Sequence, residues 1–526
     1  MQLGWLSLVP PLLVLTLAIA TKRVIPALIA GIITAACIAS NLSFIGAFKL
    51  IAHNAWQQVN QDNIYTFAFL ITLGSLIALL ERTGGTQAYA NLVQRRLKSK
   101  KQAELGSIGL SLCFMIDDFF SSITVGSIMR PLTDKYHIAH AKLAYLIDAL
   151  ASPLVILIPI SSWIAMLLAQ LEQSGISANT HNNPLILADP FATYIASIPF
   201  IFYSFITLCA VIYIVQCGIS FGPMHKHEHI AATTGNLVGG KQDLTLPLTH
   251  VHTKGAFIDF LFPFLSLFTS VFITLLYLGN FNVFGGNNTL IEAFQNTDIF
   301  IGLFLGGLLA FSASLLFSLL RNTITIATIP HIIKEGYDSM APSIAVLFLA
   351  WTFGSLLRTE LHTGAYLAQL VMQSFSVALL PCLFFIITLI TCVAIGSSWG
   401  TIAIMIPLAV PMLAQFSPLT PPLTPESVPL LYPLIAAIFA GAVAGDHVSP
   451  IASTTLMSAA SASCYLSDHV HTQIYYALPV IFGTCVSFLI AGLLATQPFW
   501  FNIACSLSVG LLLALLLLYL ANKKLK

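Results

Sequence analysis

The chain has 526 residues, of which 57% are hydrophobic and only 8% are charged, and its mean hydropathy is +0.89. A soluble domain carries about 25% charged residues, so this composition excludes a water-soluble globular protein and indicates that a lipid bilayer surrounds the chain. The net charge of +1 points to no particular partner, and we expect none among the nucleic acids.

Eleven apolar stretches are long enough to span a membrane as helices, for which about 20 residues are needed. They lie at 5–20, 24–42, 63–80, 142–169, 190–216, 257–278, 298–320, 340–357, 429–460, 473–495 and 498–520. The first stretch has no basic region before it and no small-residue cleavage site, so we expect a retained helix rather than a signal peptide. The nine cysteines show no metal-binding spacing, and we expect neither a metal centre nor a cofactor.

The positions of Lys and Arg predict the orientation of these helices, because cytoplasmic loops are enriched in both residues. If the N-terminus lies outside, all basic residues except Lys49 and Arg358 fall on the cytoplasmic side. The loops 171–189, 280–297 and 416–428 contain neither Lys nor Arg and fall outside. We therefore predict a protein of the bacterial inner membrane with its N-terminus outside and its C-terminus in the cytoplasm.

Two further apolar segments are expected to enter the membrane and return to the side from which they came. The first, at 105–129, is flanked by cytoplasmic charge and has a polar tip at 117–122. Each of its arms has about a dozen residues, or about 18 Å of helix, which is enough to reach the middle of the bilayer. The second hairpin, at 376–415, has its tip at 396–401 and enters from the outer side.

Four short similarities recur in the same order in the two halves of the chain. They pair 72–76 with 352–356, 121–124 with 397–401, Pro131-Leu132 with Pro407-Leu408, and Asp148 and Ser152-Pro153 with Asp446 and Ser449-Pro450. Each half contains five spans and one hairpin, and because five is odd the second half has the inverted orientation. Inverted repeats with interrupted helices are typical of secondary transporters.

We therefore predict an all-α polytopic membrane protein of about eleven helices. It consists of a first repeat at 1–216, a cytoplasmic linker at 217–256, a second repeat at 257–495, and a C-terminal helix with a basic tail at 496–526.

The helices 142–169 and 429–460 are expected to be broken, because each contains a Ser-Pro pair close to an acidic residue. Proline lacks a backbone donor and clashes with the preceding turn, which frees carbonyl groups to bind an ion. Ionisable residues within a membrane are costly and are usually functional. Those expected at membrane depth, with no obvious Lys or Arg beside them, are Asp117, Asp118, Asp148, Asp446 and His447.

The candidate ion- or substrate-binding residues come from both hairpin tips and both broken helices. They are Asp117, Asp118, Ser121, Ser122, Thr124, Asp148, Ser152, Ser397, Ser398, Thr401, Asp446, His447, Ser449, Ser453, Thr454 and Thr455. A sodium ion would be held by Asp446, Thr454, Ser122 and Thr124.

Structural roles compete with these assignments. Either Asp117 or Asp118 could simply cap a hairpin arm, and Asp148 could lie near the cytoplasmic surface. His447 is interpreted as a ligand or as the partner of one. The run 225–229, with three histidines, is interpreted as part of a solvated linker rather than as a metal site. Asp446 is our preferred functional acid.

The longest motifs resemble the NhaC-type Na⁺/H⁺ antiporter family. The segments 114–126 and 129–136, followed by 159–163, are similar to its first signature, and the segments 445–451, 454–455 and 467–473 are similar to its second. The resemblance covers roughly residues 60–480. It implies re-entrant hairpins, alternating access, and often elevator motion and a homodimer.

Two residues depart from the family pattern. Ser453 stands where relatives typically carry Asp, and Ser121 where they typically carry Asn. The missing carboxylate at 453 weakens the case for a strongly bound cation there. From the resemblance we predict a Na⁺/H⁺ antiporter. Because of the missing carboxylate we keep as the alternative a Na⁺- or H⁺-coupled transporter of a small solute, such as an amino acid or a hydroxy or dicarboxylic acid. No nucleophile–base pair or nucleotide-binding loop supports an enzyme.

Overall fold

The computed structural model describes residues 4–85, 88–89, 97–180, 184–242, 255–295, 297–374 and 376–524. Part of the predicted linker, at 243–254, lies outside this range. The described chain is helical almost throughout, as predicted. The exception is a short parallel pair, β1 (Ile176–Ser177) and β2 (Ile186–Leu187), in which Ile176 pairs with Ile186.

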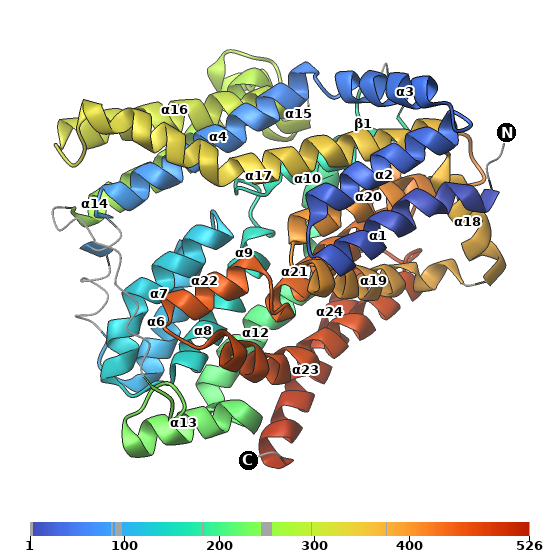
Figure 1. Ribbon diagram of the computed structural model, residues 1–526. Coiled ribbons are helices and arrows are strands. Elements are labelled where there is room, and N and C mark those ends of the chain that lie inside the picture. Colours follow the sequence, from blue (N-terminus) through green and yellow to red (C-terminus); the bar gives the residue numbers. More distant parts are fainter. Residues whose placement is uncertain are drawn as a thin grey trace.

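The helices are labelled in Figure 1. Their bounds are α1 Val9–Thr21, α2 Val24–Ala39, α3 Phe44–Gln57, α4 Gln61–Arg82, α6 Lys100–Cys113, α7 Asp118–Lys135, α8 His140–Asp148, α9 Ala151–Val155, α10 Ile164–Gln173, α11 Pro190–Ser197, α12 Phe202–Cys217, α13 Gly222–Thr234, α14 Phe257–Leu278, α15 Leu290–Gln295, α16 Ile299–Leu320, α17 Ile329–Ser355, α18 Thr363–Ser374, α19 Leu380–Ile395, α20 Ser398–Ala414, α21 Leu431–Val448, α22 Ser453–Ser461, α23 Leu466–Leu493 and α24 Phe499–Lys524.

Within the described residues, nine helices are long and apolar enough to cross a membrane, or ten if α11 and α12, bent by 42°, form one span. Eleven stretches were predicted, and nine of them are found when the bent pair is counted as one span. The tenth span, Val377–Ile395, contains α19, which was predicted as an arm of the second hairpin. The other two predicted stretches do not qualify. The stretch 24–42 forms α2, which has only 16 residues, and the stretch 142–169 is divided into α8, α9 and α10. The nonhelical residues 156–163 thus interrupt the helix that was expected to be broken.

Four long helices form one layer, which crosses the upper part of Figure 1: α4, α14, α16 and α17. The close approach of α4 to α17 depends on Gly74 and Gly336. A side chain at Gly74 would meet the Gly336 carbonyl, and one at Gly336 would meet the backbone of Ser75. Small residues allow such contact where lipid supplies no hydrophobic driving force between helices. This layer forms one wall of the functional site.

A second group of helices surrounds α21, which is almost wholly buried. Helices α19 and α23 pack against it, and α24 packs in turn on α23. A side chain at Gly441 or Gly445 would meet the backbone of α19, so both glycines are needed for this contact. The chain leaves α21 at Val448, crosses a nonhelical stretch at 449–452 and enters α22 at Ser453. This is the second predicted break.

The two predicted hairpins are the helix pairs α6–α7 and α19–α20. Helix α7 packs against α22, and α20 packs against α10, α17 and α21. Each hairpin therefore contacts the broken helix of the other half of the chain.

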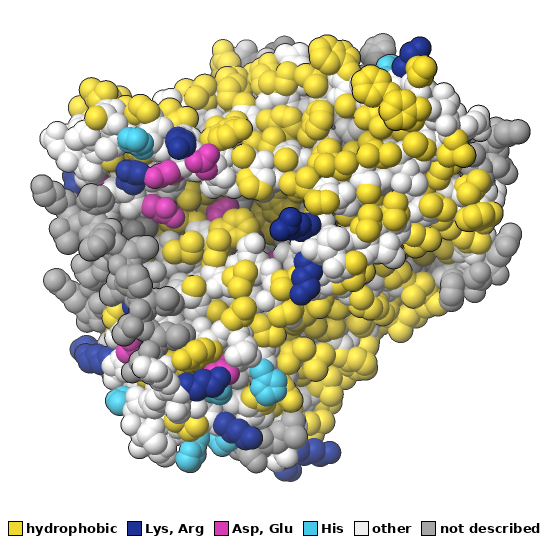
Figure 2. All heavy atoms as spheres, in the orientation of Figure 1, with side chains coloured by type: hydrophobic (Ala, Val, Ile, Leu, Met, Phe, Trp, Pro, Cys, Tyr) yellow, Lys and Arg dark blue, Asp and Glu magenta, His cyan; other side chains and the backbone are white. Residues whose placement is uncertain are grey.

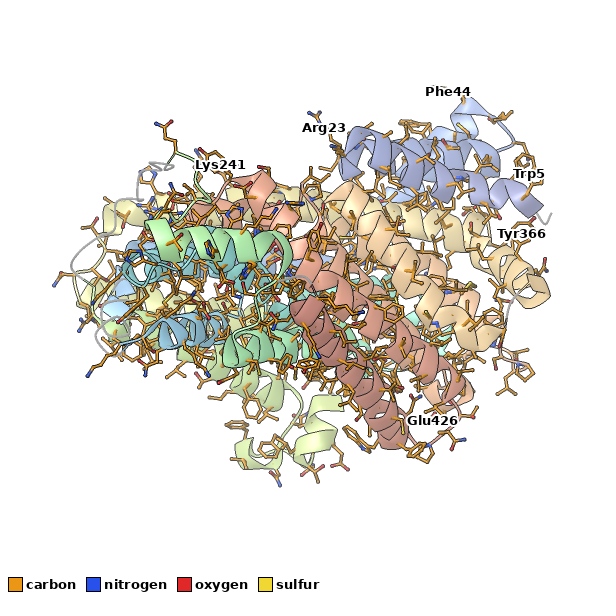
Figure 3. The ribbon with its side chains drawn as sticks, turned by 90° about the horizontal axis from the view of Figure 1, so that it is seen from below. Trp5, Arg23, Phe44, Lys241, Tyr366 and Glu426 are labelled. Atoms are coloured by element: carbon orange, nitrogen blue, oxygen red, sulfur yellow. The ribbon has the colours of Figure 1, made fainter. Side chains whose placement is uncertain are left out.

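Charged and apolar side chains are separated along the molecule. In Figure 2 hydrophobic side chains dominate the right-hand part of the visible face, and most charged and histidine side chains gather on the left and lower left. Figure 3 shows Lys241 toward the left and Trp5 and Tyr366 at the right-hand end. The predicted topology assigns Lys241 to the cytoplasm and Trp5 to the outside. The orientation itself stays a prediction.

Candidate functional site

The tip of the first hairpin is held by Asp117. Its carboxylate accepts a hydrogen bond from the Phe120 amide at 2.8 Å and thereby caps the start of α7. The Ser162 amide donates to the Ile116 carbonyl at 2.9 Å and ties the tip to the nonhelical stretch before α10. Asp117 thus takes the capping role that was one of its two interpretations, and Asp118 is the next residue along the chain.

The tip of the second hairpin has a similar construction without an acid. Gly396 ends α19 with a φ of +73°, a conformation that favours glycine. The Ser397 hydroxyl then accepts a hydrogen bond from the Gly400 amide at 3.2 Å and caps α20. The Trp399 ring lies edge-on to the ring of Trp163, with 6.2 Å between centroids. The second hairpin therefore contacts the broken helix of the first half.

The centre of the site is a pair of buried carboxylates that share one hydroxyl. The Ser152 hydroxyl, from α9, lies 3.1 Å from Asp118 Oδ2 and 2.8 Å from Asp446 Oδ2. The Thr454 hydroxyl donates to Asp446 Oδ2 at 2.7 Å, and the Trp163 indole donates to Asp118 Oδ1 at 3.2 Å. Asp118 and Asp446 are 3% and 4% exposed, so neither can rely on bulk water.

A cavity of about 540 Å³ opens on this pair. Both hairpin tips contribute to its lining through Asp117–Phe120 and Gly396–Trp399, and α22 contributes Ser453 and Met457. The opposite wall comes from α4 and α17, which present Glu81 and Glu335. The described lining residues include five acids and no Lys or Arg. Glu335 forms an ion pair with Arg82, and the other four acids form no ion pair with a Lys or Arg of the described chain.

A second polar cluster lies behind the cavity and shares none of its described lining residues. Its centre is Asp148 Oδ2, which accepts from Gln473 Nε2 at 2.9 Å and from the Thr455 hydroxyl at 3.1 Å, and lies 3.2 Å from His469 Nε2. His447 Nδ1 lies 2.6 Å from the Tyr203 hydroxyl. Asp148 and His469 have side chains that are 0% exposed, so Asp148 does not lie at the surface.

The structure separates the candidate residues into groups. Six of them line the cavity, namely Asp117, Asp118, Ser397, Ser398, Asp446 and Ser453, and two more, Ser152 and Thr454, bond to the carboxylate pair. Asp148, His447 and Thr455 belong to the cluster behind it.

The remaining candidates lie outside both groups. Ser121, Ser122 and Thr124 are buried in α7, and the Ser122 carbonyl accepts from Ser461. The hydroxyls of Thr401 and Ser449 donate to the carbonyls of Ser397 and Val393. The predicted sodium ligands Asp446 and Thr454 are therefore joined by a hydrogen bond, but Ser122 and Thr124 are not among the cavity residues.

The sequence-based candidates did not include several polar residues at these sites, among them the ionisable or amide side chains of Glu81, Glu335, His469 and Gln473. The motif at 467–473 contains both His469 and Gln473. The expected span begins at 473, whereas α23 begins at Leu466, so His469 lies in the helix about one turn before the expected span. A search for ionisable residues within one turn of each span would have found it.

The histidine run 225–229 lies in α13, which packs on α8 and α23. Burial raises the pKa of Glu228, but Lys142 Nζ at 3.9 Å and the Ser220 hydroxyl at 2.5 Å lower it more, so it lies below its usual value. No group of three or more His, Cys, Asp or Glu in the described chain is placed to hold a metal ion. The run thus forms part of a helix in the predicted linker, with Lys226 and His229 exposed and its other side chains partly buried.

The sequence matches a family model and is similar to a protein of another bacterium. Residues 173–493, more than half of the chain, match the model of the Na⁺/H⁺ antiporter family. An uncharacterized protein of Haemophilus influenzae is 32% identical over 493 residues, which cover 92% of this chain and 90% of that protein. These matches confirm the family predicted from the motifs.

Two solved transporters have similar structures. MtrF of Neisseria gonorrhoeae, described as illuminating a class of antimetabolite efflux pumps, aligns with a TM-score of 0.53 at 15% identity, over 85% of this chain and 84% of that chain. The YdaH transporter of Alcanivorax borkumensis aligns with a TM-score of 0.49 at 15% identity, over 80% of this chain and 84% of that chain. At this identity the likeness to MtrF concerns the fold alone.

Proposed function

Because this chain belongs to the Na⁺/H⁺ antiporter family, we propose that it exchanges Na⁺ for H⁺ across the bacterial inner membrane by alternating access. The exchange takes place at the Asp118–Ser152–Asp446 group. Membership of the family indicates a secondary transporter, and the exchange of these two ions is inferred from the chemistry of that group.

The observation that carries the proposal is the single hydroxyl between two carboxylates. Ser152 has one hydrogen and donates it to one acceptor at a time. Its distances of 3.1 Å and 2.8 Å to Asp118 Oδ2 and Asp446 Oδ2 are both hydrogen-bond distances. The second contact therefore requires a proton on one carboxyl group, or a cation that shields the oxygens from each other. A group satisfied by either H⁺ or a cation is what an exchanger needs.

The donor chemistry around the pair favours a hard cation. Carboxylate and hydroxyl oxygens, the ligands that such ions prefer, are supplied by Asp118, Asp446 and Thr454. The unpaired acids of the cavity attract cations and repel anions. Asp446 is the main exchanging acid in this proposal, because its Oδ2 atom lies within hydrogen-bond distance of the hydroxyls of both Ser152 and Thr454. It also comes directly after Gly445, at which α21 packs closely on α19.

Coupled transport of a small solute is a second candidate, and the size of the cavity favours it. About 540 Å³ exceeds the need of a bare ion and lies within the range of small-molecule sites, about 300–1,000 Å³. The acidic lining without described Lys or Arg disfavours a dicarboxylate and favours a solute that carries an amine.

Purified protein in liposomes distinguishes the two. The internal pH is followed as Na⁺, Li⁺ or K⁺ is added, and the experiment is repeated with a panel of amino and organic acids. Sodium/proton exchange predicts that Na⁺ alone raises the pH inside acid-loaded vesicles. A response that occurs only with a solute would overturn it in favour of the second candidate.

A further inference from the structure

The cluster around Asp148 is deeply buried, and no Lys or Arg of the described chain forms an ion pair with the Asp148 carboxylate. Asp148 ends α8, and His469 and Gln473 lie one turn apart on α23. The side chains of Asp148 and His469 are both 0% exposed. Gln473 Nε2 donates to Asp148 Oδ2 and to the His447 carbonyl, two acceptors that fix the orientation of its amide.

Four polar atoms of this cluster have no hydrogen-bond partner in the described structure, although nearly all buried polar groups in proteins have one. They are Asp148 Oδ1, His469 Nδ1, Gln473 Oε1 and His447 Nε2. By contrast, Asp148 Oδ2 has three neighbours within hydrogen-bond distance. The unused capacity is thus one carboxylate oxygen, one amide oxygen and two ring nitrogens.

The chemical nature of these four atoms indicates which ligand the cluster can bind. Imidazole is a poor ligand for Na⁺, which prefers oxygen, and the cluster is not placed to hold a transition metal. A carboxylate beside an imidazole is, however, a good acceptor for a proton. With a neutral His469 and an ionised Asp148 the pair carries one negative charge. One added proton, bound at a free ring nitrogen or carboxylate oxygen, makes it neutral.

Among the described residues, the other titratable groups that face the pair are aromatic or imidazole side chains and the carboxyl group of Asp446, which interacts electrostatically with Asp148. The rings of His447 and Tyr145 are 6.2 Å apart, and those of Tyr145 and Tyr476 are 5.2 Å apart. Lys142, on the same helix as Asp148, directs its amine to the Ile219 carbonyl at 3.5 Å and toward Glu228. In the described chain the facing groups are therefore Tyr145 from α8, Tyr203 from α12, Asp446 and His447 from α21 and Tyr476 from α23, with no Lys or Arg among them.

Two consecutive side chains connect this cluster to the cavity. At the start of α22, Thr454 donates to Asp446 Oδ2 at 2.7 Å, while Thr455 lies 3.1 Å from Asp148 Oδ2 and 3.3 Å from the Asp446 carbonyl. The Thr455 hydroxyl has one hydrogen and must choose between these acceptors. A proton on Asp148 therefore changes whether the Thr455 hydroxyl bonds to Asp148 Oδ2 or to the Asp446 carbonyl, and so changes the surroundings of Asp446.

We propose that Asp148 and His469 form a second proton-binding site, separate from the cation cavity and coupled to it through Thr455. The proposal rests on the function proposed above and extends it. Replacing a proton by a cation leaves the net charge of the Asp118–Asp446 pair unchanged, so the coupling passes through Thr455. When the cation binds, the Thr455 hydroxyl donates to Asp148 Oδ2 instead of the Asp446 carbonyl, stabilises the ionised form of Asp148 and so expels the proton from the Asp148–His469 pair. The protein thus releases a second proton, in addition to the one displaced at the Asp118–Asp446 pair.

The test compares wild type with His469→Gln and Asp148→Asn, which remove the titratable groups at little change in shape. His225→Gln, in α13, is the matched control, since its ring contacts Ser220 and lies outside the cluster. The proton release on adding Na⁺ is measured on purified protein in weak buffer. The KM for Na⁺ is measured in liposomes over a range of pH, and thermal unfolding checks folding.

We expect wild type and His225→Gln to release more than one proton per Na⁺ bound, and His469→Gln and Asp148→Asn to release about one fewer. At alkaline pH, where the pair is already deprotonated, KM should stay within about twofold of wild type. The proposal is overturned if either folded variant releases as many protons as wild type, or if its alkaline KM rises about tenfold or more, as for a direct cation ligand. If Asp148→Asn does not fold, His469→Gln decides.

Failure of the proposed function would look different, because wild type would then release no proton on adding Na⁺. In that case infrared spectra of the protein at acid and alkaline pH still test the pair. A carboxyl band that titrates in wild type and disappears in Asp148→Asn supports the site, and spectra that do not differ refute it.

Discussion

Ser152→Ala removes one hydroxyl and changes little else, so it tests the shared hydrogen bond directly. Ser152 is 2% exposed and its oxygen contacts both Asp118 and Asp446. A hydrogen bond to a charged group contributes about 1.5–3 kcal/mol, and each 1.4 kcal/mol is about tenfold in affinity. We therefore expect the apparent affinity for Na⁺ to fall about 10- to 100-fold.

The assay is the KM for Na⁺ in liposomes, with maximal rate and thermal unfolding measured in parallel. Ser197→Ala is the matched control, because Ser197 is also buried but its hydroxyl donates only to the Thr193 carbonyl of its own helix at 2.8 Å. The control should keep the wild-type KM. If Ser152→Ala also keeps it within about twofold, the shared hydroxyl does not hold the exchanging group.

Three further results are expected. Trp163→Phe removes the indole donor to Asp118 at 3.2 Å, together with part of the ring that packs on Trp399, and should lower Na⁺ affinity about 3- to 10-fold, measured as KM; an unchanged KM would exclude this bond from the site. Because the pKa of Glu228 lies below its usual value, its stabilising effect exists above the unfolded-state pKa and is lost as pH falls through the folded-state pKa. The difference in Tm between wild type and Glu228→Gln should therefore close at acid pH, and a constant difference would contradict this. In a cysteine-free background Thr420→Cys should react with an impermeant label from the periplasm and Lys226→Cys only from the cytoplasm; the reverse would refute the predicted orientation.

The local chemistry of the site could be predicted from sequence because it depends on residues that are close together in the chain. The hairpin tip predicted at 396–401 lies where α19 ends at Gly396 and Ser397 caps α20. The Ser-Pro pairs predicted that both helices are broken: Ser152-Pro153 lies in α9, just before the nonhelical stretch 156–163, and Ser449-Pro450 lies in the break before α22. The acids Asp118 and Asp446 were found because an ionisable residue in an apolar stretch is conspicuous.

The contacts that could not be predicted depend on the relative orientation of helices that are far apart in the chain. Thr454 and Thr455 look equivalent as letters, yet one faces Asp446 and the other faces Asp148, because consecutive residues point about 100° apart around a helix. Similarly, Glu335 reaches the cavity only because Gly336 lets α17 approach α4 closely. The inverted relation of the two halves, predicted from the repeats, stays a prediction.

The central claim is that a proton and a cation compete for the Asp118–Asp446 pair, and proton release tests it most directly. Na⁺ is added to purified protein in weak buffer, and the pH change is compared for wild type and Asp446→Asn. The variant keeps the hydroxyl neighbours Ser152 and Thr454 but loses the titratable group. We predict that Na⁺ acidifies the wild-type solution, while folded Asp446→Asn releases no proton at any pH. Equal proton release by Asp446→Asn and wild type would contradict the account.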